Sequence, residues 1–153
     1  MQTAPLDPAA RSADRLEPGE RLLIAALQAW LSDGSATSLR TLGKVMAWRT
    51  SPRVAALFLG WVHAMDAARL RPIEATCRHC GGASQDVQRL VVACGLAPVD
   101  LDLGERLIAP LVSEATSVMV LARALNAALA QAGWPLPARL GVQDPSHEQP
   151  TMH

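Results

Sequence analysis

The chain has 153 residues, of which 50% are hydrophobic and 18% charged, so it can bury the core of one domain and is not an intrinsically disordered chain. Its 14 basic and 14 acidic residues leave no net charge, which argues against a protein whose whole surface binds nucleic acid or anionic lipid. Aromatic residues account for only 3% and tyrosine is absent, so few side chains could stack on bases or sugars.

The N-terminal segment, residues 1–20, is polar and acidic, and it lacks the basic start and the apolar run of a signal peptide. The most apolar segments lie near residues 22–31, 54–65 and 118–129, and each is too short or too interrupted by polar side chains to span a bilayer. We therefore expect a cytoplasmic protein with no membrane segment. In that compartment the 3 cysteines are expected to be metal ligands or core thiols rather than disulfide partners.

Helix-breaking prolines and glycines, together with polar residues, set the expected domain limits. Residues 1–17 are expected to form a disordered N-terminal tail, residues 18–136 a helical domain, and residues 137–153 a disordered C-terminal tail. Within the domain, capping signals predict helix starts at Pro18, Ser35–Ser38, Ser51-Pro52, Ser84, Asp102 and Ser113. Because glycines and prolines end these segments and no strand alternation is present, we predict an all-α fold, an irregular five- or six-helix bundle.

The third expected helix, residues 52–70, carries apolar side chains on two sides. Large ones recur at helical spacing between Val54 and Met65, and Leu59 and His63 lie on the opposite face. A helix that is apolar on both sides usually packs between neighbours. We therefore expect this helix to lie in the middle of the fold.

The loop between the third and fourth expected helices, residues 71–83, contains the sharpest local signal, Cys77-Arg78-His79-Cys80-Gly81-Gly82. A C-x-x-C spacing lets two thiolates converge on one cation, and the glycines let the backbone turn so that amides point at sulfur. The segment resembles half of a zinc knuckle or zinc ribbon, and this resemblance implies a structural metal. The second C-x-x-C of such sites is absent from the chain.

A tetrahedral zinc needs two further ligands, and Cys94 and His63 are the candidates. Cys94 is expected on the inward face of the fourth helix, and His63 on the second face of the third helix. The alternatives are that Cys94 only fills the core and that His63 is an ordinary half-exposed helix histidine. The pair Cys77 and Cys80 could also be a redox couple, and the three cysteines could hold an iron–sulfur cluster. A homodimer could complete the metal site with two cysteines from each chain.

Residues 38–65 loosely resemble a helix-turn-helix, in which a capped helix, a short turn and a second capped helix follow one another. The basic residues Arg40, Lys44, Arg49 and Arg53 occur here without any acidic residue. A recognition helix offers polar side chains near its start to read base edges, whereas this one continues with small and apolar residues. The pattern therefore favours a helix that packs against the core and exposes a basic face to solvent.

The chain contains no P-loop, no G-x-S-x-G, no G-x-G-x-x-G and no H-E-x-x-H, which favours a non-enzymatic protein while leaving catalysis open. We expect a structural metal, with zinc as the predicted ion, in a helical protein that acts through protein–protein contacts as a regulator or assembly factor. Two alternatives remain. One is a DNA-binding transcriptional regulator that uses residues 38–65 and senses metal or redox state through its cysteines. The other is a small metal- or iron–sulfur-dependent redox protein.

Overall fold

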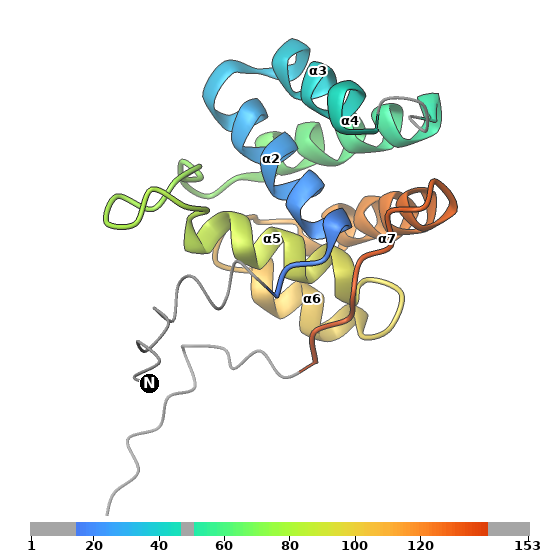
Figure 1. Ribbon diagram of the computed structural model, residues 1–153. Helices are drawn as coiled ribbons and strands as arrows, with labels where there is room; N and C mark the ends of the chain where they lie inside the picture. Colours follow the sequence, from blue (N-terminus) through green and yellow to red (C-terminus); the bar gives the residue numbers. More distant parts are fainter. Residues whose placement is uncertain (1–14, 47–50, 141–153) are drawn as a thin grey trace, which may run out of the picture.

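The computed structural model describes residues 15–46 and 51–140 (Figure 1). These ranges contain the helices α2 (Pro18–Asp33), α3 (Ser35–Met46), α4 (Pro52–Ala68), α5 (Gln85–Leu96), α6 (Leu101–Ile108) and α7 (Ala115–Gln131). Within the described ranges the only β pairing consists of two isolated bridges, so the predicted all-α bundle is confirmed. Residues 1–14 and 141–153 of the predicted tails lie outside the described residues, whereas residues 137–140, predicted to be disordered, are placed against α2.

Two serines cap helices where the sequence predicts them. The Ser51 side chain accepts a hydrogen bond from the Arg53 amide (3.2 Å), and Pro52 occupies the first turn of α4. The Ser84 hydroxyl accepts a hydrogen bond from the Val87 amide (3.0 Å) at the start of α5. These local bonds satisfy backbone donors that a helix leaves free at its N-terminus, and the Ser84 bond fixes the junction between the cysteine-containing loop and α5.

Two of the predicted caps, Asp102 and Ser113, are wrong. Asp100, rather than Asp102, caps α6, because its carboxylate reaches the Leu103 amide (3.1 Å). Ser113 does not cap α7, since its hydroxyl donates to the Ala68 carbonyl at the end of α4 (3.1 Å). That bond joins two helices that lie side by side, so tertiary packing prevails over the local capping pattern.

The centre of the fold is formed by α5 and α7. Helix α7 packs against α4, α5 and α6, while α5 also packs against α2 and α6 (Figure 1). Helices α2 and α3 form an adjacent pair joined at Gly34, whose φ of 91° only glycine adopts readily. The buried side of α4 includes an edge-to-face contact of Phe58 and Trp61, with ring centroids 6.3 Å apart.

Helix α4 is peripheral, and the prediction that it is central is wrong. Five of its large side chains are buried and Leu59 is partly buried, and the helix packs chiefly against α7. The five are Val54, Phe58, Trp61, Val62 and Met65. The opposite face is open, because His63 is exposed and Leu70 just beyond the helix is 60% exposed. The second face owes its apolar character largely to alanines, which need no packing partner to be stable in a helix.

The segment after α7 runs back across the starts and ends of earlier helices. A Cβ added at Gly19 would lie 2.7 Å from the backbone oxygen of Trp134, so only glycine allows this close approach. The Arg139 guanidinium then donates to the buried Glu20 carboxylate at 2.6 and 2.8 Å. Residues 134–140, called the C-terminal strap below, therefore hold the first turn of α2.

None of the helices in the described ranges combines the length and the apolar character that a membrane crossing would require.

Candidate functional site

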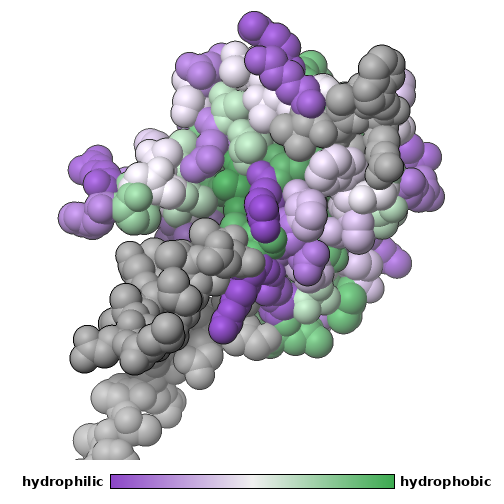
Figure 2. Space-filling view, viewed as in Figure 1, coloured by the Kyte–Doolittle hydropathy of each residue, from purple (hydrophilic) through white to green (hydrophobic). Residues whose placement is uncertain are grey.

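Residues 71–83, called the cysteine loop below, leave the helical body between α4 and α5. Figure 1 shows this segment projecting to one side of the bundle, and Figure 2 shows polar residues at its outer end. The residues from Arg78 to Gly82 are all exposed. The loop therefore presents its C-x-x-C segment to the surroundings of the protein rather than to its core.

The base of the loop is fixed by an ion pair. Arg71 donates to both carboxylate oxygens of Asp86 at 2.8 Å, and the Glu74 amide donates to the same carboxylate at 3.1 Å. Burial alone would raise the pKa of Asp86, but the Arg71 guanidinium and the Glu74 amide outweigh it and hold that pKa below its usual value. The Ser84 hydroxyl also donates to the Glu74 carbonyl.

The outer part of the loop is a short hairpin. Thr76 and Ala83 form an isolated antiparallel bridge, and the Cys77 amide donates to the Gly82 carbonyl (2.8 Å). The Gly81 amide donates back to the Cys77 carbonyl (3.0 Å), and the φ of Gly81 is 70°. This positive φ closes the turn and explains why glycine follows the second cysteine.

The hairpin brings Cys77 and Cys80 together. Both cysteines lie on the turn that the backbone bond from Gly81 to Cys77 closes. Hydrogen bonding by the Cys80 side chain and by the backbone N–H groups of His79 and Cys80 holds the pKa of Cys77 below its usual value, although burial and the nearby Glu74 carboxylate oppose it. Cys77 is partly buried and Cys80 is exposed, so the pair is open to a ligand from outside.

Cys94 lies elsewhere, in the core between α5 and α7. Its side chain is fully buried and donates to the Ala122 carbonyl (3.4 Å), while its own carbonyl accepts a bond from Asn126 (2.9 Å). Burial raises the pKa of the Cys94 thiol, which keeps it neutral. In this conformation Cys94 is a packed core thiol, the alternative that the sequence left open.

His63 lies on the exposed face of α4. Across residues 15–46 and 51–140, no group of three or more His, Cys, Asp or Glu side chains is close enough to hold one metal ion. The structure thus brings together Cys77 and Cys80, and it does not bring Cys94 or His63 to them. In this structure the four predicted ligands are not close together, so a four-ligand site within one chain stays a prediction.

The basic segment lies on α3 and α4. Arg40, Lys44 and Arg53 are exposed, while Val54 in the first turn of α4 is buried. Arg49 falls outside the described residues. The start of α4 therefore exposes one basic side chain, Arg53, and its next side chain, Val54, faces the core. This arrangement agrees with the packing role that the sequence favours.

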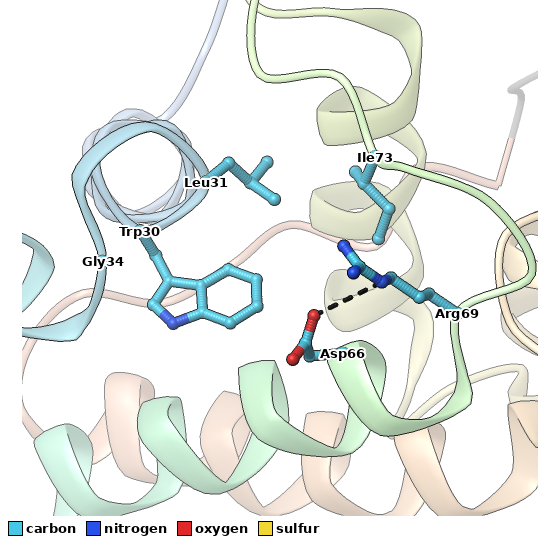
Figure 3. A pocket seen from close by; sticks show the side chains of 6 residues that line it. All are labelled: Trp30, Leu31, Gly34, Asp66, Arg69 and Ile73. Atoms are coloured by element: carbon cyan, nitrogen blue, oxygen red, sulfur yellow. Dashed lines mark ion pairs between the residues drawn. The ribbon is translucent and has the colours of Figure 1, made fainter.

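A pocket of about 230 Å³ lies beside the base of the cysteine loop (Figure 3). Trp30 and Leu31 at the end of α2 form one wall, and Ile73 faces them from the loop. Asp66 and Arg69 form an ion pair of 3.5 Å across its floor, and both side chains are about half exposed. Neither Cys77 nor Cys80 lines the pocket.

The Arg71–Asp86 ion pair is not predicted by the sequence. Arg71 precedes a proline that ends the helical segment, and Asp86 lies 15 positions away in the first turn of α5. An acidic residue in a first turn is explained by the helix dipole alone, so the sequence carries no signal for this pairing.

Comparison of the chain with protein-family models, with curated proteins and with solved structures finds no match.

Proposed function

We propose that this chain is a non-enzymatic helical protein whose Cys77–Cys80 pair binds zinc, and that it acts through protein–protein contacts as a regulator or assembly factor. The observation that carries the proposal is the geometry of the pair. The two cysteines lie three residues apart on one hairpin, which backbone bonds from Cys77 to Gly81 and Gly82 close. The lowered pKa of Cys77 favours the thiolate, which is the form that binds a metal.

The position of the pair supports a role in protein contact. The hairpin projects from the bundle, and its outer residues are exposed (Figure 1). Its base is held by the Arg71–Asp86 ion pair and by the Gln28 side chain, which donates to the Ala75 carbonyl (3.3 Å). A projecting segment with a fixed base presents the same surface to every partner, which lowers the entropic cost of binding. A cytoplasmic location fits, because thiols remain reduced there.

The test is zinc binding by the full chain. We expect zinc to co-purify and to be measurable by elemental analysis, and Cys77→Ser and Cys80→Ser each to abolish it. Cys94→Ala and His63→Ala are matched controls that remove a thiol and an imidazole from other places, and we expect both to keep the metal. Circular dichroism checks that each variant is folded. A folded wild-type chain that binds no zinc after incubation with the metal would overturn the proposal.

A further inference from the structure

The Cys77–Cys80 pair provides only half of a structural zinc site. Structural zinc ions are almost always held by four protein ligands in a tetrahedron. In the part of the chain that the structure describes, no third His, Cys, Asp or Glu side chain joins the pair. Within the described residues the pair is therefore two ligands short of a tetrahedral site.

The shape of the cysteine loop favours a source outside the bundle. Cys80 is exposed at the end of a segment that projects from the helices (Figures 1 and 2). The hairpin closes through its own backbone bonds between Cys77 and Gly82, and its base is held by Arg71 and Asp86. Because these contacts already shape the loop, a metal at its tip is not needed to fold it and is free to join it to another molecule.

We infer that one zinc ion is shared by two copies of this chain, each copy contributing the sulfurs of Cys77 and Cys80. The inference rests on the proposed zinc binding and names the partner as a second copy. A two-fold axis through the metal would place identical hairpins against each other, which is the commonest arrangement in homo-oligomers. Two pairs of thiolates then complete the tetrahedron.

A single copy on one zinc ion would leave two coordination positions open. Arg78 is exposed between the two cysteines, where a cation stabilises the net charge of about −2 on four thiolates around one Zn²⁺. The Glu74 carboxylate near Cys77 offsets part of this stabilisation.

Native mass spectrometry of the full chain, with zinc alone as the added ligand, tests the inference. We expect zinc-loaded protein to be a dimer with one zinc per two chains, and a chelator to return it to monomers. Cys80→Ser is expected to stay monomeric with zinc, while Cys94→Ala dimerises like the wild type. Cobalt in place of zinc should give the absorption bands of a site with four sulfurs.

Reversing the charge of Arg78 tests the shared zinc site independently of the thiols. Arg78→Glu leaves the thiols in place but adds negative charge beside the metal, so we expect zinc-dependent dimerisation to weaken by about tenfold or more. Arg106→Glu on α6 is the charge-matched control and should leave it unchanged. Zinc bound to monomers at one ion per chain would overturn the shared site while zinc binding stands. Failure to bind zinc at all would overturn both proposals.

Discussion

The Arg71–Asp86 ion pair gives the most direct measure of what holds the cysteine loop. Arg71→Ala removes two hydrogen bonds of 2.8 Å from a carboxylate that is only 10% exposed. Each charge-assisted bond is worth about 1.5–3 kcal/mol when buried, but Arg71 is 47% exposed and water replaces part of the loss. We expect the free energy of unfolding to fall by about 2 kcal/mol.

Arg69→Ala is the matched control, because the Arg69–Asp66 pair has the same residue types at 3.5 Å with both side chains about half exposed. Its removal should cost about 0–0.5 kcal/mol. Urea unfolding followed by circular dichroism measures both, and the Arg71 variant should move the midpoint by about 1 M. If the two variants have equal midpoints, the ion pair contributes nothing and the loop is held by other contacts.

The same pair makes a prediction about pH. Because the folded state lowers the pKa of Asp86, its contribution to stability is complete above the ordinary carboxyl pKa of about 3.9. It is lost as the pH falls from there through the lowered pKa. The difference in stability between wild type and Arg71→Ala should therefore be constant near pH 7 and narrow below about pH 4. A difference that stays constant down to the acid transition would contradict this assignment.

Two further predictions concern packing and thiol access. Gly95→Ala should lower the free energy of unfolding by about 1–3 kcal/mol, because its Cβ would overlap the Pro137 carbonyl. Gly43→Ala meets no atom within 4 Å and should raise the free energy of unfolding by about 0.5–1 kcal/mol, because alanine favours the helix. Thermal unfolding ranks the two, and equal signs would show that the strap does not press on α5. In the folded metal-free chain a thiol reagent should modify Cys77 and Cys80 but not Cys94, which is fully buried. Mass spectrometry of the labelled peptides reads this directly, and rapid labelling of Cys94 would mean that the core opens easily.

The starts of α4 and α5 could be predicted from the sequence because their capping residues act within their own turn. Ser51 and Ser84 bond to amides two and three residues ahead, so the local pattern contains the whole interaction. Ser113 offers the same pattern, but its hydroxyl bonds to Ala68, which is 45 residues away. A contact at that separation depends on helix packing, which no local pattern encodes.

Half of the predicted metal site is brought together for the same reason. Cys77 and Cys80 lie on one turn, and Gly81 supplies the positive φ that closes it, so spacing alone indicates their proximity. Whether Cys94 meets them depends on how α5 rotates about its axis. In the structure the Cys94 side chain is turned toward the Ala122 carbonyl on α7. The amphipathic pattern of α5 shows only that Cys94 faces inward. An inward-facing thiol can be a metal ligand or a core residue, so the pattern does not tell whether Cys94 faces the cysteine loop or α7.

The C-terminal strap affects when the protein can complete its folding during synthesis. Arg139 and Glu20 are 119 positions apart, so their ion pair forms only after almost all of the described chain has left the ribosome. Until then the first turn of α2 and the end of α5 lack their cover, since Gly19 and Gly95 face backbone that has not yet been made. Final closure of this fold therefore waits until the strap has been synthesised, and a nascent chain that stalls before residue 134 would expose those surfaces.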